Sequence, residues 1–454
     1  MTGFRHQSCV PPRVKAVLGS ALVGLLLEVA PTKAADVEKI DWSELPSTTL
    51  PLFYPGQSSY QWLRSEEHKR VAKAVEDGDP CLECHREEEA DLGEALVVEH
   101  SIEPNPVDGK VSLVPLEVQA ANDEVYLYMR FSWKSSGEGP GDMGNFMRYD
   151  GSEWQWYGNH RQHEAVVDDG QPAIYPDRLG IMIGDENVDM YPGQGCWMTC
   201  HDSMVGMEDQ AIEDEVAQHP VVGALYKQFG LSNDLVRKFL PESRTDETAW
   251  DAVASAEELK SLREEGKFLD LIIWDAALTN PAGVAADYSV LEVKSVDEGR
   301  SQLWPNGKMR QGPAYVFDKA AVGFSVLAES DLEDPAKAKH LIVGKTTASA
   351  DGVEFKEGDI LPAHILDSAK AKGSAADVDY AKGSLDNGTY TVVMRRKLDT
   401  GNPLDDKILE PDTVYTFGFS VHDDAAGKRA HVVSFPVTLS IGEGEADIQT
   451  VTLD

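Results

Sequence analysis

One short run of cysteine and histidine is the part of this chain best suited to chemistry. Cys81 and Cys84 are separated by two residues, and His85 follows directly. This is the spacing that attaches a c-type haem. Each thiol can bond one haem vinyl group, and the adjacent histidine can then bind the iron as an axial ligand. The run therefore predicts a covalent haem ligated by His85.

A second, looser run lies further along the chain. Cys196 and Cys200 are separated by three residues, and His201 follows. The two runs contain every cysteine of the chain except Cys9. We therefore predict a redox protein with two haem c groups, the second one ligated by His201.

Each cysteine pair has two other readings, a disulfide or a share in a zinc site. A disulfide leaves the adjacent histidine without a role. A structural zinc site takes four ligands, whereas each run supplies three at most. Haem attachment accounts for all three residues of each run.

The ligand on the other face of each iron stays open. Its identity matters because it sets the reduction potential, which methionine–histidine ligation raises. The candidates are His68 and His100 for the first haem, and His160, His163, Met309, His422 and His431 for the second. The aromatic residues 154–157 either wall a haem pocket or pack in an ordinary core.

The N-terminus has the order of a secretory signal peptide. Arg5, Arg13 and Lys15 precede the uncharged segment 16–27, and small residues lead to a cleavage site before Ala35. The apolar segment is shorter than the roughly 20 residues of a membrane-spanning helix. We predict that residues 1–34 are removed and that the protein is periplasmic, with no stable membrane span. A retained N-terminal anchor is the alternative.

The formal net charge is −37 at pH 7. Nucleic acid is an unsuitable partner because phosphate binding requires clustered lysine and arginine. The acidic surface either keeps the protein soluble or steers a basic redox partner toward a haem edge. Glycine-rich phosphate loops and hydrolase motifs are absent from the sequence.

The pattern of elements predicts a mainly β protein. A small, mostly α, cytochrome-like segment (35–105) contains a helix over 65–77 that Ser65 caps. A β-sandwich domain (106–442) follows, with a helical insertion over about 207–265, and a C-terminal tail covers 443–454. The alternating or apolar segments that predict strands are 111–118, 124–133, 178–183, 268–274, 321–327, 389–398, 413–421 and 430–441.

Several spaced blocks resemble the haem-binding domain related to ethylbenzene dehydrogenase. The resemblance covers about residues 100–442, and its blocks are 177–183, 195–201, 390–398 and 415–423. It implies a β-sandwich that holds one haem and passes electrons. In the gamma subunits of the family's molybdenum enzymes the haem is b-type, with methionine and lysine as axial ligands. The motif at Cys196–His201 departs from that pattern, so neither the ligand pair nor a molybdenum-enzyme partner carries over.

These observations favour a periplasmic dihaem c-type cytochrome that relays single electrons between redox partners. One form of this reading makes it a subunit or electron-transfer partner of an oxidoreductase. The alternative is a haem enzyme, such as a dihaem peroxidase or a small-molecule oxidoreductase, in which one iron keeps an open position. A haem-based sensor is a third reading, for which the sequence offers no output domain. Electron transfer is preferred over catalysis.

Overall fold

The main sheet contains most of the strands of this computed structural model. Residues 34–454 form one unit. The described residues are 34–55, 59–66, 68, 71–97, 111–135, 146–157, 177–201, 211–224, 238–247, 249–276, 278–299, 303–308, 310–341, 347–367, 371–423 and 431–453. Everything said below of the structure refers to these residues.

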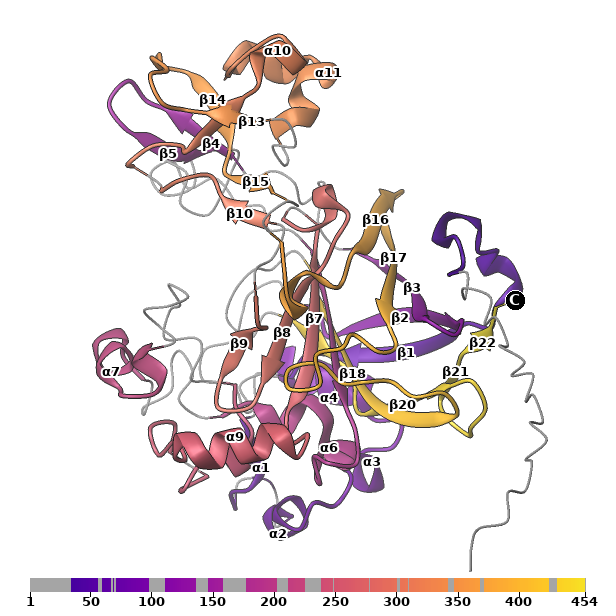
Figure 1. The fold of residues 1–454 in the computed structure, drawn as a ribbon. Helices are drawn as coiled ribbons and strands as arrows, with labels where there is room; N and C mark the ends of the chain where they lie inside the picture. The colour runs from indigo at the N-terminus through magenta and orange to yellow at the C-terminus, as the bar shows by residue number, and fades with distance from the viewer. Residues whose placement is uncertain are drawn as a thin grey trace, which may run out of the picture. The chain divides into compact units, whose positions relative to one another are not determined.

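Eleven strands form the continuous path of the main sheet, all pairing antiparallel (Figure 1). In spatial order they are β16 (Tyr380–Asp386), β17 (Thr389–Lys397), β3 (Tyr126–Lys134), β2 (Leu113–Asn122), β1 (Thr48–Phe53), β19 (Val432–Val433), β18 (Thr413–His422), β6 (Arg178–Gly184), β7 (Leu269–Asp275), β8 (Ala286–Val290) and β9 (Lys294–Val296). Off this path, β20 (Val437–Ile441) pairs with β18, β21 (Ile448–Gln449) with β20, and β22 (Val451–Thr452) with β2.

The strands form because apolar residues alternate along them. In β17, Tyr390, Val392 and Met394 are buried while their neighbours are more exposed, as the two-residue period of a strand requires. Rings from strands that are not neighbours in the sheet then meet. Phe131 of β3 lies 5.8 Å from Phe419 of β18, between ring centroids. The sheet therefore folds over, and its two halves pack against one core.

Smaller sheets form from the remaining strands. One contains β12 (Leu327–Ala328), β14 (Asp359–Pro362), β4 (Phe146–Tyr149) and β5 (Trp154–Tyr157); the others pair β10 (Leu303–Pro305) with β15 (His364–Leu366) and β11 (Tyr315–Phe317) with β13 (Thr347–Ser349). Trp154 is buried and packs against Tyr149 and Phe355. Core packing, one of the two readings of residues 154–157, is thus the role of Trp154.

The helices are short and lie between strands. The α-helices are α1 (Tyr60–Leu63), α2 (Ala72–Glu76), α3 (Cys81–Cys84), α4 (Glu89–Val97), α6 (Tyr191–Gln194), α7 (Glu213–Gln218), α9 (Ala256–Glu264), α10 (Lys319–Val322) and α11 (Pro335–Ala338). The 3-10 helices are η1 (Val37–Lys39), η2 (Trp42–Glu44), η3 (Gly195–Thr199), η5 (Pro241–Ser243), η6 (Asn280–Ala282), η7 (Glu329–Glu333), η8 (Lys339–Leu341) and η9 (Ser374–Ala376). None of the helices described is long and apolar enough for a membrane crossing. Figure 1 shows α1, α2, α3 and α6 together near one end of the main sheet.

The prediction of a mainly β chain is confirmed, and most of the expected strands are present. Two predictions of local structure are wrong. The segment 321–327 begins as the end of α10, continues without regular structure and reaches β12 only at Leu327, because Asp318 caps a helix and Gly323 ends it with φ 92°. The helix expected over 65–77 is limited, among the described residues, to α2 (72–76), and Ser65 instead donates to the Trp62 carbonyl at the end of α1.

Both ends of the described chain join the main sheet. β1 comes from the segment expected to form a separate haem-binding unit, yet it lies between β2 and β19. The expected C-terminal tail, 443–454, contributes β21 and β22. The segment that carries the first cysteine motif therefore begins with a strand of the main sheet, β1.

Candidate functional site

The first cysteine motif forms a single helical turn. Pro80 precedes α3, and the backbone N–H of His85 closes the turn by donating to the Cys81 carbonyl at 3.0 Å. This turn places both thiols and the imidazole within one short segment. Cys84 is exposed and Cys81 is half-buried. Burial raises the pKa of the Cys81 thiol to about 11, so this thiol is protonated at neutral pH.

His68 lies opposite His85. The two imidazole rings have centroids 6.1 Å apart and planes inclined by only 13°. Two imidazoles that bind one metal through Nε2, at metal–nitrogen distances of about 2 Å, have ring centroids roughly 6 Å apart. The separation therefore suits two axial ligands of one iron.

The protein holds the other nitrogen of each ring. Nδ1 of His85 donates to Glu88 Oε2 at 3.0 Å, and Nδ1 of His68 donates to the Leu63 carbonyl at 3.0 Å. A hydrogen bond at one ring nitrogen fixes the tautomer and directs the other nitrogen toward a metal. The residues of the first motif thus fit a haem iron, bound through Nε2 on each side.

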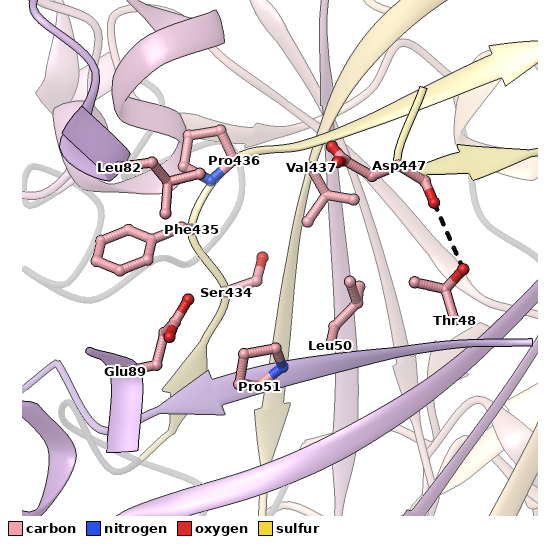
Figure 2. Close-up of a pocket in the computed structure, with 10 residues that line it drawn as sticks. All are labelled: Thr48, Leu50, Pro51, Leu82, Glu89, Ser434, Phe435, Pro436, Val437 and Asp447. Atoms are coloured by element: carbon pink, nitrogen blue, oxygen red, sulfur yellow. Dashed lines mark hydrogen bonds between the residues drawn. The ribbon is translucent and has the colours of Figure 1, made fainter. Parts of the chain in front are cut away.

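A shallow hollow borders this motif. Its volume is about 260 Å³, and Figure 2 shows Leu82 of the motif beside Phe435 and Pro436, with Leu50 and Pro51 of β1 nearby. Glu89 also lines the hollow. The surface is largely apolar, which suits the hydrocarbon edge of a macrocycle.

The second motif begins in η3 and is packed more tightly. Gly195 opens it with φ 56°, and a side chain there would meet Pro436. Cys196 lies against Gly418 of β18, where an added methyl group would overlap the Cys196 sulfur. Burial raises the pKa of the Cys196 thiol to about 11. Nζ of Lys238 is 3.5 Å from the sulfur of Cys200.

His201 is fully buried, and both of its ring nitrogens have partners. The Gln61 amide is 3.0 Å from Nδ1, and Nε2 donates to the Phe239 carbonyl at 3.2 Å. The Phe239 ring stacks on the imidazole, with centroids 3.6 Å apart, and Arg244 covers the other side of Phe239. Burial, followed by the charge of Arg244, holds the pKa of His201 well below its usual value, so the ring is neutral.

The two motifs differ in how well they fit haem. At the first motif, the His68 and His85 rings are 6.1 Å apart between centroids, and Nδ1 of each ring is bonded to an oxygen of the protein. At the second, the neutral state of His201 suits iron ligation, but Phe239 covers its ring and its Nε2 is bonded to a carbonyl. Ligation there requires Phe239 to move away.

The two motifs adjoin one another. The Gln194 side chain, just before the second motif, donates to the Val75 carbonyl at 2.7 Å. Phe435 lies 6.3 Å from His85 and 6.2 Å from Trp197, between ring centroids. Trp197 directly follows Cys196 in η3, so a chain of rings connects the motifs. Phe435 and Trp197 belong to one apolar cluster that also contains Phe53, Cys81 and Leu82.

A single helical turn also contacts the histidine of the second motif and His68, the candidate second ligand at the first motif. Within α1, Gln61 bonds His201 while the Leu63 carbonyl accepts from His68. Neither of these contacts is predicted by the amino-acid sequence. Glu88 had a detectable signal, since a carboxylate three residues after His85 can reach its imidazole; Gln61 and Phe435 had none.

The structure also bears on the alternatives. Neither Cys81 and Cys84 nor Cys196 and Cys200 are joined by a disulfide. Within the described residues, neither motif belongs to a cluster that could supply a zinc ion with its remaining ligands. His422 and His431 stack on each other at 4.7 Å. The other candidate ligands, His100, His160, His163 and Met309, lie outside the described residues.

Comparison with known proteins identifies the family. Residues 39–434 match the family model described as ethylbenzene dehydrogenase. The chain belongs to the ethylbenzene dehydrogenase family. It is 24% identical over 439 residues to cytochrome c-552 of Stutzerimonas stutzeri, an alignment that covers 96% of this chain and 98% of the relative. It is also 27% identical over 168 residues to cytochrome c-551 of Rhodocyclus tenuis, covering 37% of this chain and 57% of that protein.

Proposed function

We propose that this protein is an exported c-type cytochrome with two covalent haems, which relays single electrons between two redox partners. Its similarity to two proteins named as cytochromes c supports the class. The observation that carries the proposal of a relay is the aromatic contact between the motifs, in which Phe435 lies between His85 and Trp197. Adjacent haems form a short path for an electron.

At the first cysteine motif, which we call the first station, Cys81 and Cys84 would hold the haem, and His85 and His68 would bind its iron. Bound haem supplies one-electron iron chemistry, and its axial ligands set the potential. Glu88 and the Leu63 carbonyl orient the two imidazoles. Histidine on both sides leaves no open position for a substrate, which favours electron transfer over catalysis at this iron.

At the second station, Cys196, Cys200 and His201 have the same roles. For His201 to hold a haem iron, its Nε2 would have to give up the hydrogen bond to the Phe239 carbonyl. If Gln61 then presents its amide oxygen to Nδ1, it becomes the acceptor that orients the ring. Asparagine and glutamine amides can take either orientation, so this exchange needs no new residue.

Location and partners follow from the same proposal. We assign the protein to the periplasm on the basis of its N-terminal signal and its covalent haem chemistry. Its net charge of −37 suits partners with a positive surface around their own redox centre.

The deciding experiment counts haems in the purified protein by intact mass and by the pyridine haemochrome spectrum. We expect two haems per chain, and one in each of the variants Cys84→Ser and Cys196→Ser, since each variant damages only one motif. A wild-type protein with one haem, unchanged by Cys196→Ser, would refute the second station.

Spectra recorded with and without carbon monoxide then separate the relay from the haem enzyme. A relay with two six-coordinate irons gives low-spin spectra that carbon monoxide does not change. A high-spin iron that binds carbon monoxide in the wild-type protein, together with turnover of peroxide, would overturn the relay in favour of the enzyme.

A further inference from the structure

A group of buried carboxylates lies apart from both cysteine motifs. Asp270 of β7, Asp287 of β8 and Asp406, which follows β17 in the chain, have side chains between 0% and 2% exposed. Each offers an oxygen that lies within 4.8 Å of the oxygens offered by the other two. β7 and β8 are paired neighbours, which brings Asp270 and Asp287 onto adjacent strands (Figure 1).

Most of these oxygens have no hydrogen-bond donor. Both carboxylate oxygens of Asp287, both of Asp406 and Oδ1 of Asp270 are buried without a partner. Asp297 is a fourth case, 3% exposed and with neither oxygen bonded, and its backbone N–H approaches the Asp287 carbonyl at 3.4 Å. Buried carboxylates without partners are strongly unfavourable, and native proteins pair them or use them to bind metal ions.

The nearby cations do not balance this charge. Arg396 is 1% exposed and pairs with Asp270 at 2.5 Å, but it is 4.0 Å from Asp406. Lys407 is directed elsewhere, with Nζ 2.7 Å from Asp185 Oδ1. In the part of the chain that the structure describes, one guanidinium therefore serves four buried carboxylates, so the group has a substantial deficit of positive charge.

We propose that Asp270, Asp287 and Asp406 bind one calcium ion, with Asp297 beside them as a further acidic group. Ligands that are all carboxylate oxygens select a hard cation over zinc, copper or iron. Two oxygens that bind one calcium ion at about 2.4 Å can be at most about 4.8 Å apart, and the oxygens of this cluster stay within that limit. Magnesium retains several waters and fits a site fully buried among side chains less well.

Protons are the competing explanation for the same cluster. Burial, followed by the charges of neighbouring carboxylates, raises the pKa of Asp406 to about 8 and that of Asp297 to about 9. Without a cation these groups hold protons at neutral pH. If the cluster binds calcium, added calcium should stabilise the protein; if it holds protons instead, added calcium should have no effect on stability.

The test uses the full-length purified protein with its haems. Elemental analysis after extensive dialysis should find one calcium per chain, and removal by EGTA should lower the midpoint temperature of unfolding, which added CaCl2 restores and MgCl2 does not. In Asp287→Asn we expect calcium affinity, measured by calorimetry, to fall at least tenfold. The control Asp351→Asn alters an exposed carboxylate and should bind calcium as the wild type does.

Wild-type protein that holds no calcium, binds none in calorimetry and has the same unfolding midpoint in CaCl2 and EGTA would overturn the proposal and leave the protons in place. These measurements use the wild-type protein alone, so the test still decides the question if Asp287→Asn fails to fold. The haem count is measured on the same samples and is expected to stay constant, which separates this site from the haem stations.

Discussion

His85 and His68 are held in the same way, each with Nδ1 bonded to an oxygen of the protein. The acceptor is a carboxylate for His85 and a carbonyl for His68. A carboxylate acceptor makes imidazole a stronger donor to iron than a carbonyl does. The two ligands we propose for the first iron are therefore unequal, and His68 is the weaker of the two.

This inequality predicts the effect of changing His68. In His68→Ala we expect both haems to stay attached, because the cysteines are untouched, while one iron becomes high-spin and binds carbon monoxide. In His68→Met we expect a low-spin iron with a raised potential, because methionine stabilises the reduced state. Absorption spectra, electron paramagnetic resonance and a redox titration measure these changes.

The matched control is His219→Ala, which removes a histidine that bonds the Asp251 carbonyl, away from both motifs. It should leave every spectrum unchanged. A His68→Ala protein that remains entirely low-spin would show that another residue supplies the ligand, and the haem count of the same sample shows whether the first station is still occupied.

At the scale of elements, the second motif depends on how closely η3 approaches β18. Gly418 is the residue of β18 that faces Cys196, and its missing side chain leaves room for the sulfur and for the Tyr191 hydroxyl. Tyr191 is itself fixed by donating to the Met182 carbonyl at 3.0 Å. The position of Cys196 is therefore determined by a strand that lies more than 200 residues further along the chain.

We expect Gly418→Ala to destabilise the protein by about 1–3 kcal/mol, the usual effect of adding volume to a packed interior. It should also lower haem occupancy at the second motif. Urea unfolding and the haem count measure the two effects. In the double variant with Cys196→Ala, part of the lost stability should return; a fully additive loss would mean that the sulfur is not the group displaced.

A feature can be predicted from the sequence when residues close together in the chain determine it, and not when residues far apart in the chain do. The cysteine motifs and β17 were predictable, because spacing and alternation are local properties of the chain. The helix α10 was missed although Asp318 and Gly323 mark its ends, because apolar residues near it favoured a strand. The approach of His68 to His85 and the cluster around Asp287 were not predictable, because tertiary packing brings their members together.

At the scale of the whole molecule, the region where the predicted leader ends is built into the fold. The backbone nitrogen of Ala35 donates to Asp123 Oδ2 at 2.8 Å, and the Tyr128 hydroxyl donates to the same oxygen at 2.7 Å. Although burial alone would raise it, the hydrogen bonds from Tyr128 and from backbone amides hold the pKa of Asp123 below its usual value. Cleavage before Ala35 would convert this nitrogen to an ammonium group and strengthen the contact.

We therefore expect the mature protein to begin at Ala35, as N-terminal sequencing and intact mass can show. Asp123→Asn should reduce the free energy of unfolding by about 1–3 kcal/mol, the value of a hydrogen bond to a charged group. Because the pKa is lower in the folded state, this stabilisation is present at neutral pH and is lost as the pH falls through the folded value. The exposed Asp386→Asn serves as the control; an equal loss there, or a chain that keeps its leader, would contradict this view.

The place of β1 in the sheet has a consequence for the order of events during biogenesis. Phe53 pairs with Leu113 on one side and with Val433 on the other. One edge of β1 therefore waits for almost the entire chain to be made, and such distant pairings form slowly. Until the C-terminal strands are made, Cys81 and Cys84 therefore belong to a chain whose main sheet is still incomplete. In the cytochrome that we propose, Cys81 and Cys84 would be available for haem attachment before the C-terminal strands complete the sheet.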